Sequence, residues 1–290
     1  MIDSGTGSGS GDYVLMRNCA IYGMYHLGRG SDADAIRAFL LKSGCWPFIR
    51  QRPYDVVADP TFVPKAIFVS AYVTAPLAAD INYTLKGKEK ELQAALTALG
   101  KLTPGNVHVS VGKGEESPFA ALAGIELHKV SGPHPAGLVG TQINRIDPIN
   151  KGERVWTVSP QDLVIIGEAL LTGVFNPERT VALAGSCVKQ PQYYTTKIGA
   201  EISTFLYASG VNQKNFRVIN GDVLTGRKSR PEGHLGFYNN TVSVIPEGDD
   251  YELFGWTMPV FDKISPTRAL TFSWLKPGKK YDLDTNTNGE

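Results

Sequence analysis

Short apolar runs alternate with amphipathic segments from residue 66 to residue 184, and this alternation limits the fold more than any other feature of the sequence. Helical patterns lie between the runs, as at Leu92, Ala95, Leu96 and Leu99, which Gly100 ends. Strands that alternate with helices at this spacing predict an α/β domain with a mostly parallel sheet. The strand-length runs are residues 66–71, 107–111, 125–130, 155–158 and 180–184.

A stiff loop, SGPHPAGLVGT at residues 131–141, follows the run at 125–130. Each proline fixes its own φ, and each glycine allows a close approach that a Cβ would forbid. In parallel sheets ligands bind beyond the carboxyl ends of strands. The loop is therefore a candidate site, in which His134 either meets a ligand or is a hydrogen-bonded structural residue. Its candidate residues are Gly132, Pro133, His134, Pro135, Gly137 and Gly140.

The pattern changes after Gly185. A helix is predicted over residues 201–209, with Ile202, Phe205 and Leu206 on one face, and short strand-like runs follow at 216–219, 235–237 and 241–245. Several short strands around one helix predict a small α+β module of the β-grasp kind.

The sequence thus predicts two domains with flanking segments. An α/β domain at 31–185 begins with a helix that Ser31 caps, and the β-grasp module occupies 186–248. Residues 1–30 contain a Gly/Ser-rich linker and are otherwise unassigned. Residues 249–290 form a C-terminal extension, partly packed back, with a strand-like stretch at 253–259 and a frayed end.

Two further segments could bind a ligand. In CWPFIRQRPYD at 45–55, Arg50 and Arg52 could offer guanidinium groups to a phosphate, a carboxylate or a quinone carbonyl, with Trp46, Phe48 or Tyr54 as a stacking ring. The alternative is an Arg pair that ties this loop to backbone carbonyls at a domain junction.

The second segment, GDVLTGRK at 221–228, is a loop bounded by glycines with a cationic end. It could bind an anion or a partner surface through Asp222, Thr225 and Arg227. The alternative is a turn with solvated charges.

Composition and missing motifs exclude several functions. A net charge of +1 gives no basic field for nucleic acid. The three cysteines form no CxxC pair, and His26 and His234 lack partners at metal-ligand spacing. His108 and His128 are predicted to be sheet-face residues. No metal site is therefore predicted.

The chain also lacks GxSxG, HExxH, GxxxxGK[ST] and a GxGxxG at a strand-to-helix junction. No catalytic residue is therefore predicted, and the chain is interpreted as a binding or scaffolding component. No apolar run approaches the roughly 20 residues that span a bilayer, and no signal peptide follows Met1, so a cytoplasmic location is expected.

Several stretches in order resemble the A subunit of the sodium-translocating NADH:quinone reductase, a bacterial respiratory sodium pump. They cover the chain from about residue 33 to its end. They are SGCW at 43–46 with RQRPY at 50–54, KAIFV at 65–69 with APLAA at 75–79, GPHPAGLVGT at 132–141, VINGDVLTG at 218–226, ELFGW at 252–256 and TNG at 287–289.

The resemblance implies a Rossmann-like domain followed by a soluble-ligand-binding β-grasp domain. It also implies a peripheral subunit on the cytoplasmic face of the plasma membrane, docked on the membrane-embedded B subunit. In that family electrons pass from NADH through flavins and an iron-sulfur centre on other subunits to ubiquinone or menaquinone, while sodium is exported. Family members begin with a barrel-sandwich domain and continue past this C-terminus, so the chain is expected to be a truncated middle portion.

A quinone contact is placed, on the same resemblance, at Trp46, Arg50, Arg52, Pro53 and Tyr54. The arginines would be carbonyl donors and Tyr54 a stacking ring. No tight binding of FMN or NADH by this chain alone is expected. A free-standing soluble ligand-binding protein that uses its β-grasp module is the alternative.

Overall fold

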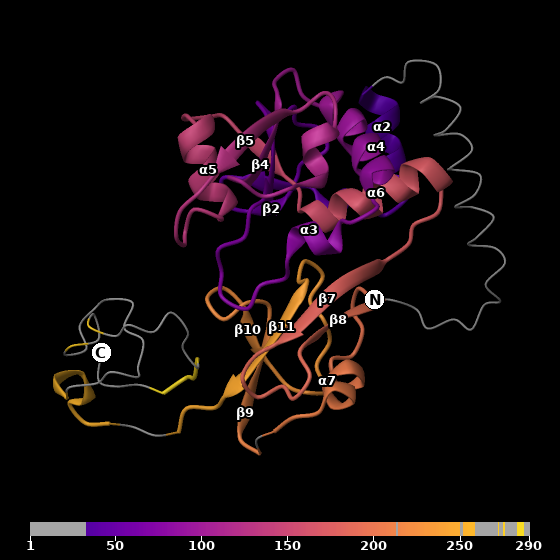
Figure 1. The fold of residues 1–290 in the computed structure, drawn as a ribbon. Coiled ribbons are helices and arrows are strands. Elements are labelled where there is room, and N and C mark those ends of the chain that lie inside the picture. The colour runs from indigo at the N-terminus through magenta and orange to yellow at the C-terminus, as the bar shows by residue number, and fades with distance from the viewer. Residues whose placement is uncertain are drawn as a thin grey trace, which may run out of the picture. The chain divides into compact units, whose positions relative to one another are not determined.

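The computed structural model describes residues 33–212, 214–249, 252–258, 272, 275 and 283–286. Two compact units form (Figure 1). The first holds the described residues through Ala75 and Asp80–Glu178, and the second holds Pro76–Ala79 and the described residues from Arg179. The predicted linker at 1–30, the cap at Ser31, the motif at 287–289 and most of the predicted extension at 249–290 lie outside the described residues.

A six-stranded sheet forms the centre of the first unit. Its order is β2-β1-β6-β3-β4-β5, in which β6, β3, β4 and β5 are parallel and the β1–β2 hairpin joins β6 antiparallel. The mostly parallel sheet predicted from the apolar runs is confirmed. The strands are β1 (Arg50–Arg52), β2 (Val56–Val57), β3 (Ile67–Ala71), β4 (Val107–Gly112), β5 (Glu126–Val130) and β6 (Val155–Thr157).

Local signals define the helices of this unit. Ser159 caps α6 by accepting a hydrogen bond from the backbone of Asp162, Pro160 occupies its first turn, and Gly173 ends it with φ 76°. The predicted apolar face of α4 is buried. The helices are α2 (Ala33–Lys42), α3 (Ile81–Thr84), α4 (Glu89–Gly100), α5 (Val139–Ile146) and α6 (Pro160–Thr172), with 3-10 turns η1 (Trp46–Phe48) and η2 (Pro118–Ala121).

Helices lie on both faces of this sheet (Figure 1). On one face Ile143 of α5 packs against Ala66, Phe68 and Val155. Helices α4 and α6 pack together on the other face, where Gly167 lies so close to the carbonyl of Glu91 that an added Cβ would be 1.9 Å from its oxygen. This three-layer arrangement is typical of α/β domains.

The second unit has its own sheet, β10-β9-β11-β7-β8, and one helix, α7 (Ser203–Ser209). Ile202, Phe205 and Leu206 are buried against the sheet, as predicted, and the α+β character of this part is confirmed. The segment Pro76–Ala79 belongs to this unit, where the backbone N–H of Ala79 donates to Thr241 Oγ1 at 3.1 Å. The strands are β7 (Glu178–Ala184), β8 (Gln192–Lys197), β9 (Phe216–Asn220), β10 (Arg227–Ser229) and β11 (Thr241–Pro246).

Four local predictions are wrong. The run at 180–184 was expected in the first sheet but forms β7, which pairs parallel with β11 in the second. Residues 235–237 are no strand, whereas β10 begins at Arg227, where only a loop was expected. The apolar stretch that begins at residue 253 is predicted to be strand-like, but residues 253–258 contain a 3-10 turn, η3 (Gly255–Thr257). Phe254 adopts a left-handed conformation, which breaks the extended pattern.

Candidate functional site

The Gly/Pro loop lies at the carboxyl end of the parallel sheet, between the end of β5 and the start of α5. A pocket of about 360 Å³ opens beside it. The loop supplies one wall, from Val130 to Ala136, and α5 supplies the other. The α5 residues that line the pocket are Thr141, Gln142, Arg145 and Ile146.

Ser70 in β3 and Tyr72 just after the strand hold this loop in place. Ser70 Oγ donates to the carbonyl of Gly137 at 3.0 Å, and Tyr72 Oη donates to that of Gly132 at 2.9 Å. Buried Gln142 donates to Ser70 Oγ at 2.9 Å. The apolar motifs did not single out these polar residues, and the position of Ser70 and Tyr72 at the carboxyl end of a parallel strand is the one signal that could have found those two.

His134 is both hydrogen-bonded and at the pocket wall, so the two interpretations of this residue coexist. Its Nδ1 lies 3.2 Å from Thr74 Oγ1, which accepts the backbone N–H of Gly137 at 3.1 Å. The Thr74 hydroxyl can either donate its proton to His134 Nδ1, which places the ring proton on Nε2, or accept a proton from Nδ1 through its second lone pair. Nε2 is a hydrogen-bond donor in the first case and an acceptor in the second.

The glycines of the loop have different roles. An added Cβ on Gly137 would lie 2.7 Å from both the backbone nitrogen and Oγ1 of Thr74, so only glycine fits there. Gly132 has φ 132°, which also favours glycine. Gly140 was expected in the loop but lies in the first turn of α5, with nothing within 4 Å of an added Cβ. Pro133 and Pro135 are exposed at the pocket rim.

In the segment at 45–55, two of the proposed stacking rings are buried. Trp46 is 4% exposed, donates from Nε1 to the carbonyl of Ala58 at 2.8 Å and packs edge-on against Trp156. Phe48 is 1% exposed. Tyr54 is 88% exposed, at the turn between β1 and β2. Among the candidate rings, only Tyr54 is therefore available for stacking with a ligand.

The two arginines of this hairpin close its turn. Arg50 Nη2 lies 2.8 Å from the Asp55 carboxylate and donates to the Asp55 carbonyl at 2.5 Å, and Arg52 Nε lies 3.2 Å from the same carboxylate. Pro53, after a cis peptide bond, precedes Tyr54 and Asp55, which both have positive φ. The contact from Arg50 to a backbone carbonyl is the structural alternative foreseen from the sequence.

The loop at 221–228 closes on itself. The Asp222 carboxylate accepts the backbone N–H groups of Leu224 and Thr225 at 2.8 and 2.9 Å, and it also accepts the Thr225 hydroxyl. Arg227 is exposed at the start of β10. The first two candidates for partner contact thus shape the turn, and Arg227 remains on its surface.

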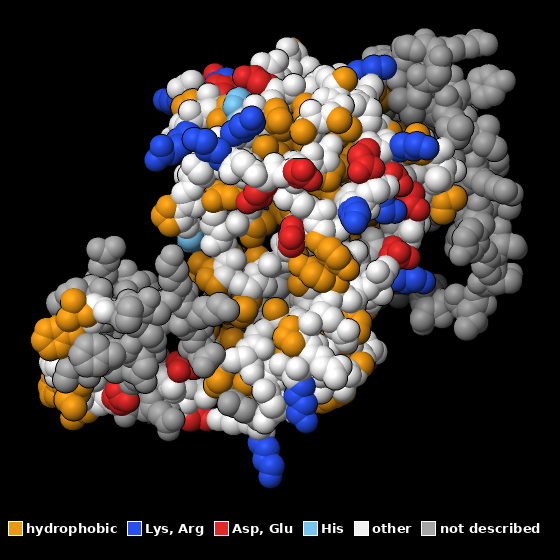
Figure 2. Space-filling view, viewed as in Figure 1, with side chains coloured by type: hydrophobic (Ala, Val, Ile, Leu, Met, Phe, Trp, Pro, Cys, Tyr) orange, Lys and Arg blue, Asp and Glu red, His pale blue; other side chains and the backbone are white. Residues whose placement is uncertain are grey.

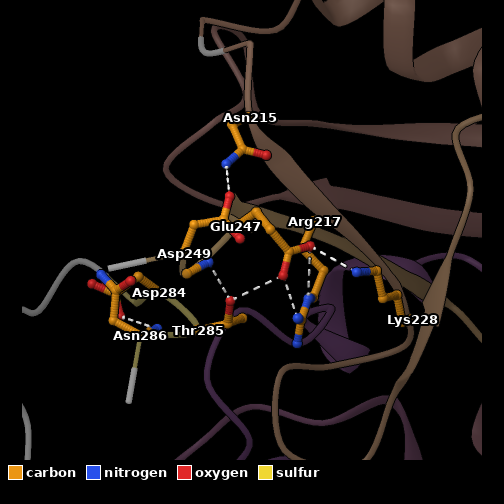
Figure 3. A network of polar contacts seen from close by, with 9 residues as sticks. Asn215, Arg217, Lys228, Glu247, Asp249, Asp284, Thr285 and Asn286 are labelled. Carbon is orange, nitrogen blue, oxygen red and sulfur yellow. Dashed lines mark hydrogen bonds and ion pairs between the residues drawn. The ribbon is translucent and has the colours of Figure 1, made fainter. Parts of the chain in front are cut away.

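Glu247, which follows β11, is the centre of a polar network (Figure 3). Its carboxylate accepts hydrogen bonds from Arg217 and from Lys228 Nζ, the latter at 2.9 Å, and a weaker one from Thr285 at 3.4 Å. The hydrogen bonds from Arg217 and Lys228 lower the pKa of Glu247 to about 2. This carboxylate therefore stays ionised and joins β9, β10 and residue 285.

Cys45 is not suited to nucleophilic chemistry. It is fully buried before η1, and this burial raises the pKa of its thiol to about 11. The thiolate, which is the reactive form, is therefore scarce at neutral pH.

Strand pairing also brings His108 next to Glu126 and His128, which are far from it in the sequence. His108 on β4 meets Glu126 and His128 on β5, and their ligand atoms all lie within 4.8 Å of one another.

Acidic and basic side chains are interspersed over the first unit on the face that Figure 2 shows.

Within the described ranges, no helix has the length and apolarity to cross a bilayer.

Comparison with known families gives two matches. Residues 31–175 match the model of the "NqrA second alpha/beta domain", and residues 180–230 match that of the "NQRA C-terminal domain". The NAD⁺-reducing [NiFe]-hydrogenase in its H₂-reduced state has a similar fold, with a TM-score of 0.52 and 13% identity over 81% of this chain and 50% of that chain. This likeness concerns the fold alone.

Three relatives are each named as the A subunit of a Na(+)-translocating NADH-quinone reductase. Those of Neisseria meningitidis serogroup B, Vibrio atlanticus and Rhodopirellula baltica are 40%, 39% and 38% identical over 88%, 89% and 86% of this chain. The matches cover 57%, 57% and 55% of the relatives' own lengths. The chain belongs to the NqrA family, which is that of the A subunit of the Na(+)-translocating NADH-quinone reductase.

Proposed function

We propose that the chain serves as the corresponding part of the A subunit in a sodium-pumping NADH:quinone reductase, where it docks and positions other components. One observation carries this proposal: relatives with that name are about 40% identical along both units. Flavins and the iron-sulfur centre would lie on other subunits, so that this chain contributes surface rather than redox groups.

The contacts of the candidate residues support a scaffolding role. Arg50 and Arg52 hold Asp55, Asp222 holds its own turn, and Glu247 is paired with two cations. Ionisable groups committed in this way stabilise the fold, and none of them is placed as an acid or base beside a nucleophile.

The docking partner in this proposal is the membrane-embedded B subunit, on the cytoplasmic face of the membrane. A quinone contact, with ubiquinone or menaquinone, would lie at the tip of the β1–β2 hairpin. Tyr54 is exposed there, and Val56 and Val57 nearby are 47% and 46% exposed. An apolar tip with one aromatic ring suits a quinone ring better than the paired arginines do.

Affinity purification tests the partner. The tagged 290-residue chain is coexpressed with the other reductase subunits of its own host, and detergent-solubilised membranes are passed over the tag resin. We expect the B subunit to elute with the chain, and the tag on an unrelated protein is the control. Recovery of folded chain without the B subunit contradicts the proposed docking.

The quinone contact is tested in the same complex. Tyr54→Ala removes the ring that would stack on the quinone and is therefore expected to raise the KM for quinone severalfold. The B subunit should still copurify, because the ring is exposed and the hairpin does not depend on it. Tyr83→Ala, at another exposed tyrosine, is the matched control. An unchanged KM in Tyr54→Ala rejects the contact but leaves the docking proposal standing.

A further inference from the structure

Three metal-ligating side chains converge at the edge of the parallel sheet in the first unit. β4 and β5 lie side by side (Figure 1), with His108 opposite Glu126 and Ser110 opposite His128. Glu126 and His128 are two residues apart on β5 and therefore share a face of the sheet. Because β5 is the edge strand, this group opens to solvent at Glu126, which is 49% exposed.

The distances between the ligand atoms suit a metal ion. His108 Nδ1 lies 3.0 Å from His128 Nε2 and 3.2 Å from Glu126 Oε2, and His128 Nε2 lies 3.9 Å from Glu126 Oε1. Ligands bound to a tetrahedral zinc ion at about 2.0–2.2 Å stand about 3.3–3.6 Å from one another. The two separations from His108 Nδ1 are slightly shorter than this, and the separation of His128 Nε2 from the other Glu126 oxygen is slightly longer. Modest side-chain shifts would therefore bring one ligand atom of each residue, which already lie within 4.8 Å of one another, onto one ion.

Neighbouring residues hold two of the three ligands in position. Asn106 Nδ2 donates to Glu126 Oε2 at 2.9 Å, and the His108 ring stacks on Phe68 with centroids 4.7 Å apart. Phe68 is itself packed under α5. Such outer contacts orient the ligands of metal sites and are part of how those sites are built.

A cation also resolves a hydrogen-bonding conflict. A proton on His108 Nδ1 can be donated toward His128 Nε2 or toward Glu126 Oε2, whereas one cation satisfies both rings and the carboxylate together. Two imidazole nitrogens and one carboxylate oxygen form a donor set that suits zinc, and three protein ligands leave the fourth tetrahedral position to water.

We propose that His108, Glu126 and His128 form a binding site for a divalent transition-metal ion of the zinc type at the edge strand of the parallel sheet. The site is separate from the Gly/Pro loop, because His108 and Glu126 lie near the amino ends of β4 and β5, whereas the loop follows the carboxyl end of β5. An ion there would fasten the edge strand β5 to β4. The proposal does not depend on the proposed role in the reductase.

Zinc binding by the untagged 290-residue chain tests the site. The protein is stripped with EDTA and titrated with Zn²⁺ against a chromophoric chelator, and melting curves are recorded with Zn²⁺ and with EDTA. We expect one Zn²⁺ per chain and a higher Tm with zinc. With Co²⁺ we expect the intense visible absorption of a tetrahedral complex, whereas Mg²⁺, which prefers oxygen ligands, should have no effect.

Variants separate this site from other zinc-binding groups. His128→Gln and Glu126→Gln are expected to weaken zinc binding at least tenfold and to abolish the rise in Tm. His134→Gln and Glu115→Gln, outside the cluster, should bind zinc as the parent does. Melting in EDTA shows whether each variant is folded.

Two results would overturn the proposal. One is the absence of any Zn²⁺ bound at micromolar concentration by the folded parent chain. The other is equally tight binding by the parent, His128→Gln and Glu126→Gln, which would place the zinc elsewhere and leave the three residues as a hydrogen-bonded cluster.

Discussion

Replacing Gly137 with alanine is expected to disrupt the Gly/Pro loop. The new Cβ would lie 2.7 Å from the backbone nitrogen and Oγ1 of Thr74 and 2.8 Å from the Tyr72 carbonyl oxygen, so the loop must move away. That movement weakens two hydrogen bonds, from Gly137 N–H to Thr74 and from Ser70 to the Gly137 carbonyl. Each is worth about 0.5–1.5 kcal/mol, and overpacking adds about 1–3 kcal/mol.

Because a surface loop relieves part of the clash by moving outward, we expect a total loss of about 2–4 kcal/mol. At about 2–4 °C per kcal/mol, the Tm of the first unit should fall by about 4–16 °C. Gly140→Ala is the matched control: it lies three residues away in α5 with open space around the new Cβ, so its Tm should be unchanged or slightly higher. Differential scanning calorimetry measures both variants. Equal stability of Gly137→Ala and Gly140→Ala would refute the account of how the loop is held.

The contacts of three other residues give further predictions. Arg50→Ala loses both bonds to Asp55 and should lower the free energy of unfolding by about 1 kcal/mol. Tyr54→Ala, the control, should leave the Tm unchanged. If Arg50→Ala is as stable as the parent chain, this arginine has no structural role. Because the folded pKa of Glu247 lies below its unfolded value, its ion pairs stabilise the protein above about pH 4.5, and this contribution of about 1–2 kcal/mol is lost as the pH falls toward 2. Urea unfolding between pH 7 and pH 2 should therefore show a weaker acid dependence in Glu247→Gln, and identical profiles would contradict it. Cys45 should resist iodoacetamide at pH 8 until the chain unfolds, as read by peptide mass spectrometry, and equal labelling rates in buffer and in urea would show that its thiol is not buried.

Elements with local signals could be predicted from the sequence. Helix α6 carries its cap, its first-turn proline and its terminal glycine within the segment itself, and the burial of α4 follows from its periodicity. The apolar pattern at 180–184 predicts a strand but does not indicate to which of the two sheets it belongs. Its place is decided by pairing with β11, about 60 residues further along the chain, which no local pattern encodes.

The candidate site shows the same division. The stiffness of the Gly/Pro loop and its position after a parallel strand followed from its residues, but its tethers Ser70 and Thr74 come from β3 and from the residues just after it. His108 could not be linked to Glu126 without the register of β4 on β5. The spacing of Glu126 and His128 along one strand was the single local hint of that cluster.

A domain exchange tests the central claim most directly. The matching part of the A subunit in the Vibrio atlanticus reductase is replaced with residues 33–249 of this chain, and the complex is purified from membranes and assayed for sodium-stimulated NADH:quinone reductase activity. If the chain performs the proposed docking role, the chimeric subunit should copurify with the complex and retain a substantial part of the activity. A chimera that folds, as judged by its melting curve, but is absent from the purified complex would contradict the account.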